Sequence, residues 1–72
     1  MWDKDSETLY RFASNLVYYM NRLGYSQSYL SEITDISEGS ISKYVNALQM
    51  PRLSTLMRLA TALHCTVEEL VD

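Results

Sequence analysis

The stretch ISEGSISKYVN, residues 36–46, carries side chains suited to hydrogen bonding with a partner. Glu38 accepts hydrogen bonds, Lys43 donates them, and an amide side chain follows three residues later. Apolar Ile41 and Val45 lie four residues apart, which predicts a helix with one buried face. The opposite face then exposes a polar set: Glu38, Gly39, Ser40, Lys43 and Asn46. Side chains of these types suit recognition of a partner by hydrogen bonding. With one acid and one base, the helix is close to neutral.

His64 and Cys65 are the pair that most resembles reactive chemistry, and their types and spacing argue against it. One His beside one Cys is too few ligands for a structural zinc site. Adjacent residues do not face each other on a helix, and no Ser-His-Asp arrangement can be built from this chain. We therefore expect no enzyme, no metal, no cofactor and no small-molecule ligand. A single cysteine also forms no internal disulfide, which favours a reducing compartment.

Length and composition favour one compact all-α domain over residues 1–72. The chain has 72 residues, 47% of them hydrophobic, with two glycines and one proline, which is too few turn residues for a many-stranded sheet. It has no apolar run of about 18 residues, and its start is acidic where a signal peptide is basic. We expect a cytoplasmic protein with no membrane association.

The net charge of −3 argues at first sight against nucleic acid as a partner. The acidity, however, lies at the two ends of the chain. Residues 22–64 carry four Arg and Lys side chains against three carboxylates. The middle of the chain is therefore slightly basic.

Capping and turn residues divide the chain into five predicted helices. The first covers about 7–23, with Asp5 or Ser6 as its cap and Gly24 after its end; the second, QSYLSEIT, follows Ser26 as cap. DIS makes a tight turn in which Ser37 caps the third, about 38–48. The fourth follows Pro51, and TVEEL forms the fifth with a capping box of Thr66 and Glu69.

Periodicity predicts which apolar residues face the core. They recur at steps of three and four residues in each helix. The inward set is Leu9, Phe12, Ala13, Leu16, Val17, Met20, Leu23, Leu30, Ile33, Ile41, Val45, Leu48, Leu53, Leu56, Met57, Leu59, Ala60, Leu63, Val67 and Leu70.

Two short helices joined by a tight turn, about residues 26–48, have the geometry of a helix-turn-helix. Residues 23–70 resemble the lambda-repressor and Cro-like helix-turn-helix family. The matching positions are Ser26, Gln27, Leu30, Ile36, Ser37, Ile41, Ser42 and Pro51, then Leu56, Leu59, Ala60, Ala62, Leu63, Val67 and Leu70. The resemblance implies a compact five-helix fold.

The resemblance also implies which residues contact operator DNA. The base-reading positions fall on Gln27, Glu38, Gly39, Ser40 and Lys43. Gln pairs with adenine or phosphate, and Glu accepts from cytosine. The phosphate-positioning set is Ser42, Asn46 and Arg52, and Ser37 at the helix start completes the expected DNA-binding residues.

The chain departs from the family pattern after the third helix. Val45 and Ala47 stand where the family usually has Glu and Gly, and Leu48, Gln49 and Met50 replace basic residues that grip phosphate. Fewer cations mean weaker non-specific affinity. This combination resembles small temperate-phage switch proteins of the Cro type and the modulator-of-repression type. The implied function is transcription regulation in a lysis/lysogeny switch, binding operator DNA alone, as a homodimer or with a partner repressor.

An alternative is an antirepressor that binds the phage repressor directly. Its contact face would be Gln27, Glu38, Lys43, Tyr44 and Met50, because an acidic face suits a basic DNA-reading surface. Two simpler interpretations stay open. Tyr44 and Leu48 pack on the fourth helix while Met50 fills a gap, and Glu38 only stabilises the first turn of its helix.

Overall fold

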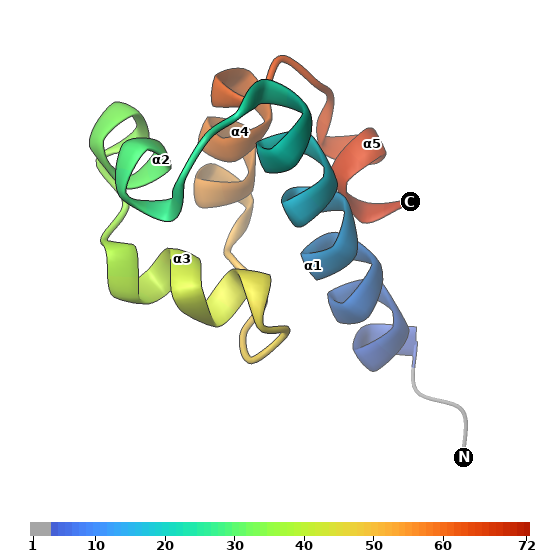
Figure 1. The fold of residues 1–72 in the computed structure, drawn as a ribbon. Coiled ribbons are helices and arrows are strands. Elements are labelled where there is room, and N and C mark those ends of the chain that lie inside the picture. Colours follow the sequence, from blue (N-terminus) through green and yellow to red (C-terminus); the bar gives the residue numbers. More distant parts are fainter. Residues whose placement is uncertain (1–3) are drawn as a thin grey trace.

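The computed structural model describes residues 4–72, with side chains from residue 6 onward (Figure 1). Within that range the chain forms five α-helices and no strand. They are α1 (Lys4–Leu23), α2 (Gln27–Thr34), α3 (Glu38–Val45), α4 (Leu53–Ala62) and α5 (Val67–Val71). The long α1 crosses one side of the molecule, α5 packs against it, and α2 and α3 lie on the other side with α4 behind. The predicted all-α architecture of five helices is confirmed for the described residues.

The helix starts follow the predicted caps except in α1. Ser26 accepts a hydrogen bond from the Tyr29 amide, and Thr66 and Glu69 form the capping box of α5. The caps predicted at Asp5 and Ser6 are wrong, because both residues lie inside α1. A helix continues through a good capping residue when the residues before it also adopt helical dihedrals.

Three helices end through the same left-handed turn. Gly24 follows α1 with φ of 74°, Ala47 follows α3 with 56°, and His64 follows α4 with 58°. Each is followed by an amide that donates to the carbonyl five residues back, as Leu48 does to the Lys43 carbonyl at 2.8 Å. Ala47 and His64 therefore occupy the conformation in which glycine is cheapest.

The core is built from all five helices. Its fully buried large side chains are Phe12, Leu16, Leu30, Ile41, Leu59, Leu63 and Leu70. Ala13, Met20, Leu56 and Ala60 are also buried as predicted, and Val45 and Val67 pack against the core. Three tyrosines, Tyr10, Tyr18 and Tyr29, are exposed.

Six predicted core residues are exposed instead: Val17, Leu23, Ile33, Leu48, Leu53 and Met57. A domain of this size covers each helix with few neighbours, so the buried stripe is narrower than the apolar stripe. Leu48 has a further reason. The helix ends at Val45 and not at residue 48, and the left-handed Ala47 turns the chain before Leu48 is reached.

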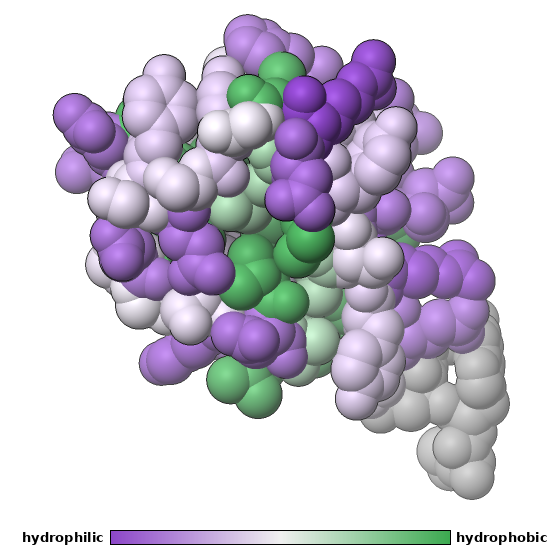
Figure 2. Space-filling model, viewed as in Figure 1, coloured by the Kyte–Doolittle hydropathy of each residue, from purple (hydrophilic) through white to green (hydrophobic). Residues whose placement is uncertain are grey.

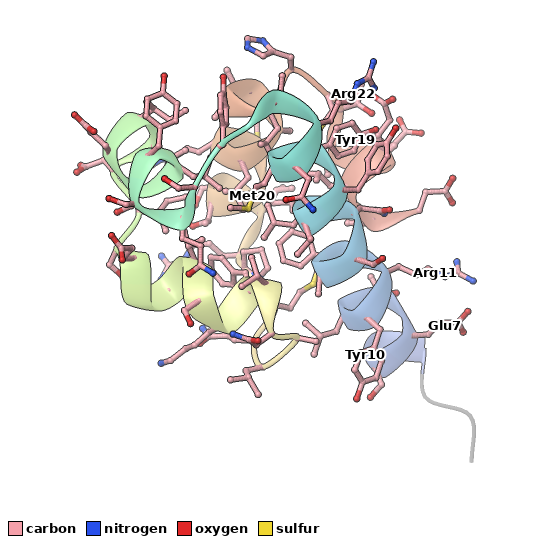
Figure 3. All side chains as sticks on the ribbon, viewed as in Figure 1. Glu7, Tyr10, Arg11, Tyr19, Met20 and Arg22 are labelled. Atoms are coloured by element: carbon pink, nitrogen blue, oxygen red, sulfur yellow. The ribbon has the colours of Figure 1, made fainter. Side chains whose placement is uncertain are left out.

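Polar contacts fasten α5 to α1. The Asn15 amide donates to the Leu70 carbonyl at 3.0 Å, and the Tyr19 hydroxyl donates to the Glu69 carboxylate at 3.4 Å. Figure 3 shows Tyr19 and Arg22 on the side of α1 next to α5, whereas Met20 points into the helical interior. Across the described residues, no helix is long and apolar enough to span a membrane.

Candidate nucleic-acid interface

The turn between α2 and α3 is held by hydrogen bonds and by one buried side chain. Asp35 takes the left-handed conformation, φ 61°, and its amide donates to the Ser31 carbonyl. Ser31 Oγ in turn donates to the Ile36 carbonyl at 2.5 Å, and the Ile36 amide donates to Thr34 Oγ1 at 3.3 Å. Ile36 is itself buried. The direction of α3 relative to α2 is therefore fixed by local contacts.

The start of α3 uses the two serines predicted to lie in the DNA-binding set. Ser37 Oγ accepts from the Ser40 amide at 3.1 Å and donates to Ser40 Oγ at 2.9 Å. Ser37 is thus the cap of α3, as predicted. Its hydrogen-bonding capacity is already partly used within the helix.

The outward face of α3 presents most of the predicted base-reading residues. Glu38, Gly39 and Lys43 are exposed, and Ser40 is half-buried. Gln27, the first residue of α2, is also half-buried. The outer face of α3 is therefore open to a partner over the length of the helix.

Two of the three predicted phosphate-positioning residues, Asn46 and Arg52, lie at helix ends, and Ser42 lies within α3. The Asn46 side-chain amide donates to the Ser42 carbonyl at 2.8 Å and so closes the end of α3, while its oxygen has no hydrogen bond with a described residue. Arg52 is exposed at the cap position of α4 and makes no capping hydrogen bond. Within the described residues, Lys43, Arg52 and Arg58 are in no ion pair, whereas Arg11 pairs with Glu7 on the outer side of α1 (Figure 3).

The partner face predicted around Tyr44 is wrong in its aromatic part. Tyr44 is only 6% exposed and packs in the core against Phe12, because its position on α3 faces α1. Met50 packs partly buried against the core, which agrees with the gap-filling interpretation. Leu48 is 72% exposed and does not pack on α4. Figure 2 shows apolar side chains on the face where α1 and α3 approach each other, surrounded by hydrophilic ones.

His64 and Cys65 show no arrangement for chemistry. His64 is exposed in the left-handed turn after α4. Partial burial raises the pKa of the Cys65 thiol, and the Glu69 carboxylate raises it further, which disfavours the reactive thiolate. Among the described residues, no group of three or more His, Cys, Asp and Glu side chains is placed to hold a metal ion.

The family model for helix-turn-helix proteins matches residues 16–70, which include all of α2, α3 and α4, the C-terminal part of α1 and most of α5. The chain belongs to the lambda-repressor and Cro-like helix-turn-helix family. This helix-turn-helix protein is a DNA-binding transcription regulator. Neither a curated protein nor a solved structure matches the chain.

In this helix-turn-helix domain, Arg58 is a basic residue that the predicted DNA-binding set leaves out. It lies on α4 and lines the same open hollow as Arg52, Ser37 and Ser40. The sequence contains one signal for it, since α4 and its cap carry two arginines and no acid. Spacing within the helix-turn-helix motif does not reveal it, because α4 lies outside the two motif helices.

Proposed function

We propose that this protein regulates transcription in a phage-type lysis/lysogeny switch by binding operator DNA, alone, as a homodimer or with a partner repressor. The observation that supports it is the outer face of α3. Glu38, Gly39 and Lys43 are exposed on α3, and the turn before α3 fixes the direction of this helix. Helix-turn-helix proteins insert the corresponding helix into the major groove of DNA. The switch role itself rests on the resemblance to Cro-type and modulator-of-repression proteins.

The roles proposed for individual residues follow from their chemistry. Lys43 donates to guanine or to phosphate, Glu38 accepts from cytosine, and Gln27 at the start of α2 pairs with adenine or a phosphate. Ser42, Asn46 and Arg52 position the backbone. Lys43, Arg52 and Arg58, which have no ion pair with a described residue, supply the electrostatic attraction.

Selection from a random duplex library followed by fluorescence anisotropy tests the proposal. Enriched sequences reveal the operator, and an inverted repeat with centres about 10 base pairs apart indicates a homodimer. Lys43→Ala is expected to weaken binding to the enriched site. Arg22 is an exposed cation at the end of α1, outside the two motif helices, so Arg22→Ala removes the same charge and is expected to leave binding largely unchanged. An absence of enrichment at low salt, or equal loss in both variants, would refute DNA reading by α3.

The antirepressor mechanism is the second candidate, and the exposed Glu38 favours it. Glu38 lies in the first turn of α3 with no hydrogen bond or ion pair to another described residue, so its carboxylate is available to a cation of a repressor. Since Tyr44 is buried, the contact would involve Gln27, Glu38 and Lys43, with Met50 at its edge. Co-elution of the chain with the repressor encoded beside it, abolished by Glu38→Lys and competed by operator DNA, is the expected result.

A further inference from the structure

One face of α1 is exposed over about three turns and carries no charge. Tyr10, Ser14, Val17 and Asn21 are all exposed and follow one another at steps of four, three and four residues. These steps repeat every seven residues, which is the spacing of the contact line between two helices in a coiled coil. Residues 12–21 include no charged side chain. These four residues, which we call the α1 seam, have the spacing of a surface that packs against another helix.

The polar groups of the α1 seam are available to a partner, whereas those on the side of α1 next to α5 are used within the domain. The side chains of Tyr10, Ser14 and Asn21 make no hydrogen bond with a described residue. Asn15 and Tyr19, in contrast, both donate hydrogen bonds to α5. Figure 3 shows Tyr10 clear of the other helices and Tyr19 next to α5. Protein interfaces are enriched in tyrosine and depleted of charge at their centres, and the α1 seam shares both properties.

The α1 seam is complementary to a second copy of itself that runs in the opposite direction. A two-fold axis between residues 15 and 16 lies midway between Tyr10 and Asn21, and also midway between Ser14 and Val17. In an antiparallel pair about this axis, the Tyr10 hydroxyl donates to the amide oxygen of Asn21 of the second copy. The small Ser14 side chain leaves room for Val17 of the second copy. Each contact occurs twice, as two-fold symmetry requires.

The flank of the α1 seam adds charge complementarity to the same arrangement. Arg11 and Tyr18 are exposed, and they lie on one flank because they are seven residues apart. In an antiparallel pair this flank of one helix faces the same flank of the other. The Arg11 guanidinium then lies near the Tyr18 ring of the second copy, and a cation is attracted to the face of an aromatic ring. A second copy thus matches the seam and its flank together.

We propose that α1 is a dimerisation helix, through which two copies of the chain pair in antiparallel orientation along their α1 seams. A standard interface buries about 800 Å² on each partner, and one short helix face covers less, so the dimer is weak, with a Kd of roughly micromolar or above. None of the seam residues belongs to α2 or α3. The dimer itself does not depend on the proposed function, but its use in binding an operator as a homodimer rests on it.

Sedimentation equilibrium of the full chain without DNA, from micromolar to millimolar concentration, tests the pairing. The mass is expected to rise from that of one chain to that of two. Val17→Glu places a charge in the centre of the seam and should weaken dimerisation at least about tenfold. Ile33→Glu on α2 is the matched control, because Ile33 is also β-branched and is 43% exposed against 38% for Val17. Circular dichroism checks that both variants fold. A monomer at every concentration, or equal weakening by both variants, would overturn the dimer.

Cross-linking tests the antiparallel register. In a Cys65→Ala background, which removes the native thiol, Ser14→Cys chains are mixed with Val17→Cys chains in a glutathione redox buffer. The proposed register places residues 14 and 17 of the two copies opposite each other, within reach of a disulfide. The mixed disulfide should therefore form faster than either disulfide between identical positions. Faster cross-linking of 14 to 14 or of 17 to 17 would overturn the antiparallel pairing.

The outcomes for the dimer and for the proposed function are separate. If the chain dimerises through the α1 seam but a random duplex library yields no enriched site, the dimer stands and the proposed function fails. If an operator is enriched while the chain stays monomeric at millimolar concentration, the dimer is refuted and the proposed function stands. If the chain stays monomeric while Val17→Glu abolishes co-elution with the repressor encoded beside it, the seam binds that repressor and the dimer is again refuted.

Discussion

The Tyr44 ring stands edge-on to the Phe12 ring, with centroids 6.0 Å apart and planes at 73°. The pair joins α1 to α3 within the core. It therefore fixes the rotation of α3 about its own axis, and so decides that Glu38, Gly39 and Lys43 face outward. An aromatic residue in the recognition helix contributes here by orienting that helix.

Tyr44→Ala is expected to reduce the free energy of unfolding by about 3–5 kcal/mol, the usual range for removing a buried aromatic ring. Tyr44→Phe should change it little, because the hydroxyl has no hydrogen bond within the described residues. Urea unfolding followed by circular dichroism measures both. A loss below about 1 kcal/mol for Tyr44→Ala, as is usual at surface positions, would contradict the buried placement.

Ala47→Gly is expected to stabilise the protein. The left-handed conformation of Ala47, φ 56°, costs a residue with a Cβ roughly 1–2 kcal/mol, of which the greater flexibility of unfolded glycine cancels about half. The remaining gain of about 0.5–1 kcal/mol corresponds to a rise in Tm of roughly 2–8 °C for a chain of this size. Gly24→Ala, at the equivalent position after α1, is the control and should lower Tm. Equal Tm values for Ala47→Gly and the wild type would argue against strain at this turn.

The local chemistry of the chain predicted these turns well. Ser26, Ser37, Thr66 and Glu69 cap the helices as expected, because a cap depends on a few neighbouring backbone groups. Gly24, predicted to follow the end of the first helix, and Asp35, in the predicted tight turn, both take left-handed conformations. The predicted site on α3 follows from these boundaries, since a fixed start and a fixed buried face determine which side chains point outward.

What the sequence could not predict depends on tertiary neighbours. Tyr44 and Leu48 lie four residues apart and looked equivalent, yet one is buried and the other is 72% exposed. The difference arises because Tyr44 meets Phe12 of α1, while the chain leaves α3 before Leu48. Arg58 was left out of the site for the same reason. Arg58 lines the same hollow as Arg52 and Tyr44 only because α4 packs against α2 and α5, and that packing cannot be read from the spacing of residues.

Leu48→Ser is expected to leave stability within about 0.5 kcal/mol of the wild type, because an exposed side chain loses little by becoming polar. Ile41→Ala, at a fully buried position of α3, should cost about 2–5 kcal/mol. Thermal unfolding of both variants distinguishes the exposed position from the buried one. A large loss for Leu48→Ser would show that this residue is covered in solution, for example by a second copy of the chain.

The capping box of α5 makes stability depend on acid pH. Hydrogen bonds from the Thr66 amide and then its side chain lower the pKa of Glu69 below its ordinary value of 4.5. The stabilisation is therefore present above pH 4.5 and is lost as the pH falls through the lower folded-state pKa. Urea unfolding from neutral to acid pH should show a smaller acid-linked loss for Glu69→Gln than for the wild type. Glu68→Gln removes the same charge one residue away, and an identical effect there would contradict the capping mechanism.

Glu38→Lys separates the two proposed mechanisms in one variant. For a protein that reads DNA through α3, replacing an acid by a cation beside Lys43 raises non-specific affinity and steepens the salt slope by about one. For an antirepressor, the same change removes the carboxylate that contacts a cation of the repressor. Binding to the repressor is then lost, whatever the affinity of the variant for DNA. Both cases share a cost of about 0.3–1 kcal/mol in stability, because the positive end of the α3 dipole then faces a cation.

Glu32 is an exposed acid on α2, so Glu32→Lys makes the same charge change and is the control for net charge. If Glu32→Lys reproduces either binding effect, the position of Glu38 on α3 is not what matters.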